Sequence, residues 1–243
     1  MIASAQNVLV KHLVKLRENK HYREKCGSIL VSGIKLIREI AVQTPPNKLF
    51  VLDPLDSFLD VPTYQISPAV LKKITGLPSP EPIAAEFPLP PQSSMEKRAP
   101  ILVLDAIRDP GNLGTLLRTS LAFGWGGVFF LPTCVDPFNE KVIRSSRGAL
   151  FRLPWKIGTW EDLSKLKETE KLTAYIADIE GEALTSIQKE KNLLLILSNE
   201  AHGVCQQGEA FGKKITIPME EKMESLNVSV AGAILMYFLK VGL

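Results

Sequence analysis

Cysteine is scarce in this 243-residue chain, which has three, and none of them stands in a C-x-x-C pair. Widely spaced single cysteines exclude a disulfide scaffold and a cysteine-built zinc site, and they fit a reducing compartment. Long apolar runs are also missing, since the best candidate, residues 228–241, is shorter than the roughly 18 residues of a membrane helix. We therefore expect an intracellular protein with no membrane partner, in the cytoplasm or, after loss of a transit peptide, in a chloroplast or mitochondrion.

The usual nucleotide-binding motifs are absent as well. The sequence contains neither G-x-G-x-x-G after a strand nor G-x-x-x-x-G-K-[ST], and it suggests no metal site. These absences disfavour an oxidoreductase that binds a dinucleotide and a hydrolase with a phosphate-binding loop.

Positive charge is concentrated at the N-terminus. Residues 1–50 hold nine Lys and Arg against three Glu, a net charge of +6, whereas the rest has 20 basic and 23 acidic residues. A basic segment on a near-neutral body is typical of proteins that bind a polyanion. A solvated helix face is the alternative interpretation, which charge alone favours.

A proline- and serine-rich segment predicts the domain boundary. Residues 88–100 contain four prolines and two serines, so we place a linker at 88–99 between domains at 1–87 and 100–243. In the first domain, mixed helical and strand patterns predict a small α/β module, with one helix capped by Ser67.

The second domain alternates short apolar runs with helical patterns, which predicts an α/β fold with a mainly parallel sheet. One of these runs, residues 193–197, shows no alternation of apolar and polar side chains. Such a run is expected for a strand that is covered on both faces.

The first candidate site segment, residues 105–118, follows an expected strand end. We predict that Asn112 caps the next helix and that Arg118, one turn after Gly114, leans back toward that strand end. Ligands of open α/β sheets bind at the carboxyl ends of the strands. An ordinary turn followed by a surface arginine is the alternative.

Two further segments join polar and small residues in the same way. Residues 198–204 (SNEAHGV) follow the apolar run, and His202 there is a weak general-base candidate. Residues 217–219 (IPM) precede residues 225–233 (SLNVSVAGA), where Ser225 is predicted to cap a helix that runs to about Lys240.

Together, the three segments closely resemble the motifs of the SpoU (TrmH-type) RNA 2′-O-ribose methyltransferases of the SPOUT superfamily. The resemblance implies an α/β catalytic domain with a C-terminal trefoil knot, S-adenosylmethionine as cofactor, methyl transfer to a ribose 2′-hydroxyl of RNA, and a homodimer. The first domain is similar to the small RNA-binding ribosomal-protein modules that precede many family members. The bipartite architecture favours rRNA over tRNA, and the modified nucleotide stays open.

The resemblance also assigns roles to single residues. Arg118 would bind the target phosphate and stabilise charge as the hydroxyl loses its proton, since an arginine pKa above about 12 makes a neutral guanidine costly. Asn112 would hold Arg118 or the phosphate, and Glu200 would contact the ribose or orient Arg118. Ser225 and Asn227 would be polar site residues. The cofactor-binding set would be Ser198, Asn199, Gly203, Ile217, Pro218, Met219 and Leu226.

Three positions depart from the family pattern. Ser198 and Ala201 stand where glycine is common, and both are small enough to keep the loop. Ser32 stands where the N-terminal module often has glutamate, which weakens inferences about the RNA target.

Two alternatives remain for function and one for assembly. A non-catalytic RNA-binding homologue acting in ribosome assembly would not need the intact set of polar motif residues, and an unrelated oxidoreductase lacks its motif. The apolar run at residues 234–239 covers every side of a helix, so we expect one side to meet a second copy. Coverage by the N-terminal module is the alternative.

Overall fold

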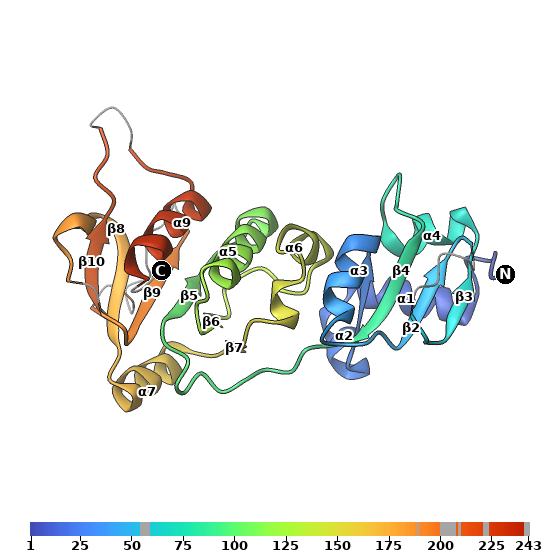
Figure 1. Cartoon of the computed structure of the whole chain (residues 1–243), viewed down its shortest axis with the longest axis horizontal. Coiled ribbons are helices and arrows are strands. Elements are labelled where there is room, and N and C mark those ends of the chain that lie inside the picture. Colours follow the sequence, from blue (N-terminus) through green and yellow to red (C-terminus); the bar gives the residue numbers. More distant parts are fainter. Residues whose placement is uncertain (54–58, 189, 200–207, 209, 221–223, 241–243) are drawn as a thin grey trace. The chain divides into compact units, whose positions relative to one another are not determined.

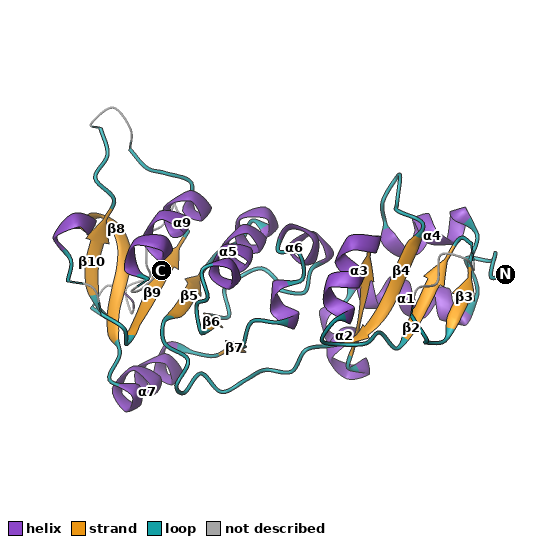
Figure 2. Cartoon of the chain, in the orientation of Figure 1, coloured by secondary structure: helices purple, strands orange, loops and turns teal. Residues whose placement is uncertain are grey.

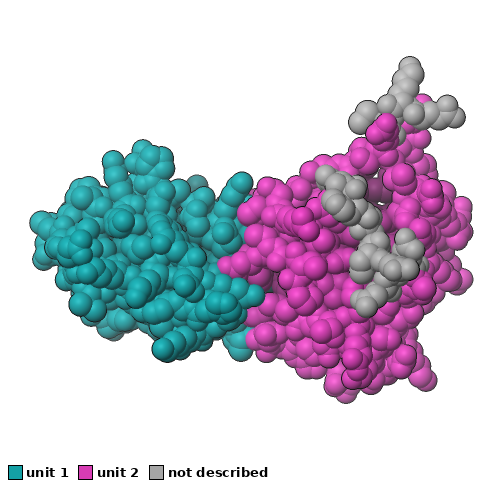
Figure 3. All heavy atoms as spheres, turned by 180° about the vertical axis from the view of Figure 1, so that it is seen from behind, with its two compact units in different colours: residues 1–91, 138–151 teal, residues 92–137, 152–243 magenta. Residues whose placement is uncertain are grey.

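The computed structural model describes residues 1–53, 59–188, 190–199, 208, 210–220 and 224–240. Packing divides the chain into two compact units, residues 1–91 with 138–151 and residues 92–137 with 152–243, which Figure 3 shows in different colours. The sequence did not predict that residues 138–151 pack with the first unit. Among the described helices, none has the length and apolar character needed to cross a bilayer.

Unit 1 is an α/β module, as expected (Figure 1). Its sheet has the strand order β1-β4-β2-β3, with β4 antiparallel to both neighbours and β2 parallel to β3. In chain order its elements are α1 (Val8–Glu18), α2 (Lys20–Cys26), β1 (Ser28–Ser32), α3 (Ile34–Ala41), β2 (Lys48–Val51), β3 (Thr63–Gln65), α4 (Pro68–Thr75), β4 (Ile83–Pro88), α6 (Glu140–Ser145) and a 3₁₀ turn (Ala149–Phe151). The predicted cap of α4 is confirmed, because the Ser67 side chain accepts a hydrogen bond from the Val70 N–H at 3.3 Å.

Unit 1 holds a buried carboxylate on the sheet face that α1 covers. Glu86 of β4 is 4% exposed; its Oε2 accepts a hydrogen bond from Lys48 Nζ at 3.0 Å, and its Oε1 lies 3.4 Å from His12 Nε2. Burial alone would raise the pKa of the Glu86 carboxyl, but Lys48, with Ser28 and His12, outweighs it and lowers that pKa below 4.5. Glu86 is therefore ionised at neutral pH.

We expect Glu86→Gln to lower the free energy of unfolding at pH 7 by about 1–3 kcal/mol, because Lys48 loses its charged partner. The folded-state pKa is lowered, so this stabilisation is complete above 4.5 and disappears as the pH falls through the folded value. Urea unfolding followed by circular dichroism between pH 7 and pH 3 measures the difference. The exposed Glu24→Gln is the control, and a gap between wild type and Glu86→Gln that stays constant with pH would contradict the assignment.

Unit 2 contains the predicted parallel sheet, whose order is β10-β8-β9-β5-β6-β7 (Figure 2). Every ladder between these strands is parallel. Its elements are β5 (Ile101–Asp105), α5 (Pro110–Ala122), β6 (Gly127–Phe130), β7 (Trp155–Ile157), α7 (Trp160–Glu170), β8 (Thr173–Ala183), a 3₁₀ turn (Leu184–Ser186), β9 (Leu193–Ser198), β10 (Lys213–Thr216) and α9 (Val228–Leu239).

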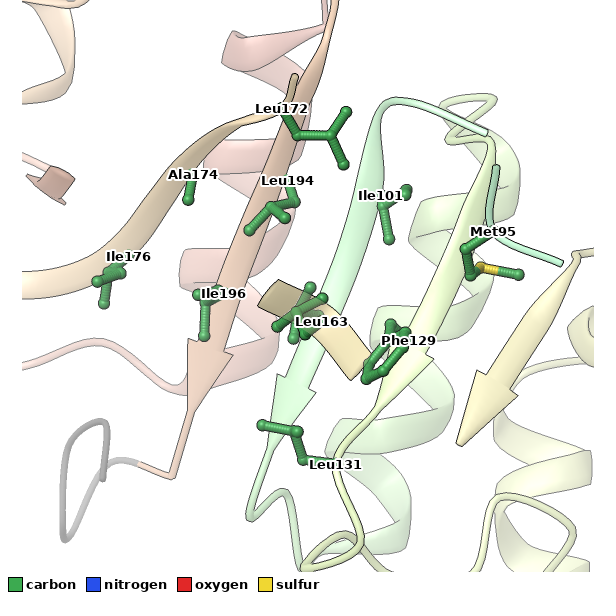
Figure 4. Packing of buried hydrophobic residues seen from close by; sticks show 11 residues of the cluster. Met95, Ile101, Phe129, Leu131, Leu163, Leu172, Ala174, Ile176, Leu194 and Ile196 are labelled. Atoms are coloured by element: carbon green, nitrogen blue, oxygen red, sulfur yellow. The ribbon is translucent and has the colours of Figure 1, made fainter. Parts of the chain in front are cut away.

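Helices cover both faces of the unit 2 sheet. On one face, Leu163 of α7 packs into a cluster with alternate strand residues such as Ile101 and Ile196 (Figure 4). On the other, α9 packs against α5 and β9. All five residues of 193–197 are at most 1% exposed, which confirms a strand covered on both faces.

A glycine lets α9 lie close to its neighbours. A Cβ at Gly232 would stand 2.4 Å from Leu116 Cδ2 of α5 and 2.6 Å from Leu197 Cδ1 of β9. The sequence predicted that small residues at the start of this helix let other groups approach closely, and Gly232 does so for α5 and β9.

Candidate functional site

A cavity of about 400 Å³ lies where the carboxyl ends of β9 and β10 and the middle of β8 meet the start of α9. Its walls combine apolar side chains with polar groups from strand ends, as is typical of small-molecule sites. The lining residues are Ala177, Asp178, Ile179, Leu197, Ser198, Asn199, Ile215, Thr216, Ile217, Met219, Glu224, Ser225, Leu226, Val228, Ala231 and Leu235.

Most of the predicted cofactor residues that the structure describes meet at this cavity. Ser198, Asn199, Ile217, Met219 and Leu226 line it, and so does Ser225 from the predicted catalytic set. Pro218 is not among the lining residues, although both of its neighbours are. Glu200 and Gly203 lie outside the described residues.

Asn112 and Asn227 are brought together from segments that are 115 residues apart. Asn227 Nδ2 donates a hydrogen bond to Asn112 Oδ1 at 3.1 Å, so the first turn of α5 is tied to the start of α9. Because this bond occupies Asn112 Oδ1, the Asn112 amide N–H groups remain as donors to an acceptor such as a phosphate oxygen.

Both predicted helix caps in the motifs were wrong by a few residues. Helix α5 begins at Pro110, and its cap is Asp109, whose Oδ1 accepts a hydrogen bond from the Asn112 N–H at 2.8 Å. Proline suits the first helical position, since it has no N–H to satisfy there. Asn112 thus lies in the first turn with its side chain free for tertiary contact.

Helix α9 is capped by Asn227 rather than by Ser225. Asn227 Oδ1 accepts hydrogen bonds from the Ser229 N–H at 3.0 Å and from Ser229 Oγ at 2.6 Å. The side-chain oxygen of Asn227 therefore caps α9, while the side-chain nitrogen of the same residue donates to Asn112. Ser225, two residues earlier, is exposed at the cavity instead.

Arg118 is exposed on α5 and is not a lining residue of the cavity. It makes no hydrogen bond or ion pair with any residue that the structure describes. None of the five N–H donors of the guanidinium is used by a described residue, so they remain for an anionic ligand. Its predicted lean toward the strand end stays a prediction.

The loop after β5 is held by a small hydrogen-bond network. Thr133 Oγ1 donates to the buried Asp105 carboxylate at 3.0 Å and accepts from the Ala106 N–H at 3.0 Å. Asn199 Nδ2 donates to the Ala106 carbonyl at 3.4 Å, which joins this loop to the end of β9. This network therefore connects the first motif segment, residues 105–118, with the second, residues 198–204.

The nearby thiol of Cys134 is unreactive. It donates a hydrogen bond from Sγ to the Leu104 carbonyl at 3.2 Å. Burial raises its pKa to about 12, so the thiol stays protonated at pH 7 and no thiolate nucleophile forms there.

Sequence reasoning missed one wall of the cavity, residues 177–179 of β8, together with Glu224 and several apolar residues of β10 and α9. A usable signal existed for β8, since residues 172–177 are one of the short apolar runs of the second domain and this run ends beside the wall. In a parallel sheet, neighbouring strands end at the same edge, where ligands bind.

A parallel α/β sheet with a ligand-sized cavity at the carboxyl ends of its strands defines an α/β enzyme fold with a small-molecule site. Comparison with known proteins specifies the family. Residues 99–237 match the model of the SpoU rRNA Methylase family, and residues 7–85 match an MRM3-like substrate binding domain. The chain belongs to the SpoU rRNA methylase family.

Individual relatives agree with this family over nearly the full length. The chain is 32% identical to the 23S rRNA guanosine 2′-O-methyltransferase RlmP of Bacillus subtilis, covering 98% of each protein. A putative RNA methyltransferase of the TrmH family from Porphyromonas gingivalis has a similar structure, with a TM-score of 0.85, 28% identity, and coverage of 99% of this chain and 98% of that one. An AdoMet-bound rRNA methyltransferase from Sinorhizobium meliloti shares the fold, with a TM-score of 0.86, 23% identity, and coverage of 98% and 96%.

Proposed function

We propose that this protein is an RNA methyltransferase that transfers the methyl group of S-adenosylmethionine (AdoMet) to a ribose 2′-hydroxyl of rRNA. The observation that carries the proposal is the cavity at the strand ends, where residues of the second and third motif segments converge. The relative RlmP catalyses this class of reaction on 23S rRNA. We also propose that the protein works in the cytoplasm or in an organelle; a relative from a bacterium and one named as mitochondrial support this location.

The residues present fit AdoMet. The cavity has the volume of a small-molecule site, about 300 Å³ or more. Ile215, Leu226 and Leu235 offer an apolar surface for adenine and the methionine chain. The main-chain groups of Ser198, Ile217 and Leu226 would hold the adenine and methionine parts, with Asn199, Met219 and Gly203 completing the site.

When bound, AdoMet supplies an electrophilic methyl group on a sulfonium. The chain's own residues then place the ribose. Asn112, fixed by its bond from Asn227, donates to the target phosphate, and Ser225 and Glu200 contact the ribose. The oxygen that gains the methyl group loses its proton, and the adjacent RNA phosphate assists that loss.

Arg118 stabilises the negative charge that develops on the ribose oxygen and orients the phosphate. Its exposure and lack of a partner among the described residues suit this role, because none of the described carboxylates competes for the guanidinium. Charge stabilisation by a fixed donor is worth most at the transition state, where the charge is largest.

Residues 1–87 are the proposed RNA-binding part, and residues 100–243 are the proposed catalytic part, joined through the linker at residues 88–99. On helices α1 and α4, Lys11, Lys15, Lys72 and Lys73 are exposed. Arg17 ties the two helices together, since its guanidinium donates to the Lys73 carbonyl at 3.1 Å. Adjacent helices with exposed lysines form the kind of surface that contacts phosphates.

We further propose that the C-terminal segment forms the family's trefoil knot and that two copies pair through α9. One side of α9 is buried at Leu235, Met236 and Leu239, whereas Val230, Ile234 and Tyr237 are 48%, 39% and 59% exposed. These three recur at spacings of four and three residues, so they form one apolar stripe. A second copy across a two-fold axis would cover it.

Light scattering is expected to give about 54 kDa, twice the mass of the 26.8 kDa chain. The double variant Ile234→Asp/Tyr237→Asp should halve that mass, because two buried charges would face the same charges in the partner. Val42→Asp is the control, since Val42 is an exposed apolar residue of unit 1 at 83%. A wild-type monomer that is active at micromolar concentration would refute the dimer.

The proposed function is tested with AdoMet and rRNA. Calorimetry should show AdoMet binding to the purified protein, and mapping of 2′-O-methyl groups should show one rRNA site missing in cells without it. Tight rRNA binding without AdoMet binding or methyl transfer would support the alternative, a non-catalytic homologue in ribosome assembly. Loss of a tRNA modification instead would place the substrate among tRNAs.

A further inference from the structure

Strand β8 leaves its regular pairing with β10 at the edge of the cavity. Lys214 of β10 stands opposite Ile176, but the next residue, Ile215, stands opposite Glu182. Residues 177–181 therefore have no opposite residue in β10 and form a bulge. Bulges often re-aim side chains next to functional sites, and residues 177–179 of this bulge line the cavity.

A glycine makes the return from this bulge possible. A Cβ at Gly181 would lie 2.4 Å from the Ile215 backbone nitrogen, closer than any side chain allows. The chain thus crosses directly over β10 at Gly181, and this crossing keeps the preceding residues beside the cavity.

The bulge contains the carboxylate of Asp178, which two interactions hold in place. Asp178 Oδ1 accepts a hydrogen bond from the Glu180 N–H at 2.9 Å, and its Oδ2 lies 2.8 Å from Lys214 Nζ. Burial alone would raise the pKa of Asp178, but Lys214 and the Glu180 N–H outweigh it and lower that pKa below its ordinary value of 3.8. The side chain, 21% exposed, is ionised at neutral pH and restrained from both oxygens.

Asp178 still has capacity for a ligand. An ionised carboxylate accepts about four hydrogen bonds, and the two bonds described use half of them. No described lysine or arginine is among the lining residues of the cavity, where Asp178 and Glu224 are the acidic ones. The described charges at the cavity are therefore negative, which favours a ligand that carries hydrogen-bond donors and a net positive charge.

We propose that Asp178 is a further cofactor-binding residue, which accepts a hydrogen bond from a hydroxyl or ammonium group of AdoMet. AdoMet offers two such donors, the ribose diol and the methionine ammonium. Lys214 is a positioning residue that holds the carboxylate in place. The inference rests on the proposed AdoMet-dependent activity, and it deepens that activity by adding a side chain from outside the three motif segments.

The test compares Asp178→Asn with wild type in the full-length protein, using calorimetry with two probes. AdoMet carries both donors, whereas 5′-methylthioadenosine carries the ribose diol without the ammonium. We expect AdoMet affinity to fall about tenfold or more, the loss typical of a hydrogen bond to a charged group. An equal loss with methylthioadenosine assigns the diol as the donor, and a loss with AdoMet alone assigns the ammonium.

Glu180→Gln is the matched control. It removes one negative charge from the same bulge, but Glu180 is exposed and does not line the cavity. Affinity within about twofold of wild type in this control, beside the loss in Asp178→Asn, excludes a general charge effect. A loss in Glu180→Gln as large as that in Asp178→Asn would overturn the proposal.

Steady-state kinetics, which give kcat and KM separately, distinguish a binding role of Asp178 from a merely structural one. In Asp178→Asn, KM for AdoMet should rise while kcat and KM for RNA stay close to wild type. The melting temperature without ligand should fall only by the small effect of losing the partly exposed pair with Lys214. Asp178→Ala repeats the test if the amide distorts the bulge. Unchanged AdoMet affinity in folded Asp178→Ala overturns the proposal, whereas a wild type that fails to bind AdoMet refutes the proposed function itself.

Discussion

Arg118→Ala is expected to lower the rate of methyl transfer at least about 100-fold while AdoMet affinity stays unchanged. Removing one charged contact to a transition state costs on the order of 10²-fold or more. Arg118 is not among the cavity-lining residues, which are the ones proposed to hold the cofactor. Single-turnover transfer with saturating AdoMet and rRNA measures the rate, and calorimetry measures the affinity.

Arg118→Lys refines this result. Lysine keeps the charge but not the planar fork of donors that matches a phosphate, so we expect an intermediate rate. Arg108→Ala, at an exposed arginine in the loop between β5 and α5, is the control and should retain most of the activity. Turnover of Arg118→Ala near the wild-type rate would sink the assignment.

Gly232→Val is expected to destabilise unit 2 by about 3 kcal/mol or more and to weaken AdoMet binding. Even one Cβ at this position meets Leu116 Cδ2 and Leu197 Cδ1 at 2.4 and 2.6 Å, and both leucines are buried, so they must shift within a packed core. Because Val228, Ala231 and Leu235 of the same helix line the cavity, displacing α9 changes the site. Chemical denaturation and calorimetry measure the two effects.

Gly232→Ala separates packing from helix propensity. In an exposed helix this change stabilises by about 1 kcal/mol, so propensity and packing predict opposite signs here. We expect a net loss of stability, smaller than that of the valine variant. A stabilised Gly232→Ala protein would show that α9 and its neighbours do not pack as closely as the contacts indicate.

The sequence by itself determined the fold class and the order of the motif segments. The unalternating run at 193–197 predicted a strand covered on both faces, because apolar side chains on both sides need two covering layers. Ser67 with Pro68 predicted the start of α4, because this cap bonds a backbone N–H only three residues along the chain. The residues that were expected to bind one ligand, such as Ser198 and Ile217, line one cavity.

The predicted caps of α5 and α9 were placed at the wrong residues. Asn112 and Ser225 both have good capping side chains, yet Asp109 and Asn227 cap these helices. For α5 the local signal was present, since Asp109 followed by Pro110 has the same form as Ser67 followed by Pro68. The tertiary structure adds the bond from the Asn227 amide to Asn112, 115 residues away. No neighbouring residue in the sequence reveals such a pair.

The tertiary structure alone decided which side chains reach the cavity from outside the motifs. In the sequence, Asp178 is one charged residue in a polar stretch and nothing singles it out. In the structure, the shift in pairing between β8 and β10 places it in a bulge beside the cavity. The packing of residues 138–151 with unit 1 was equally hidden, since chain order places them between β6 and β7. The physical reason is the same in both cases: register and packing depend on contacts between distant segments, and a local pattern of residues does not encode them.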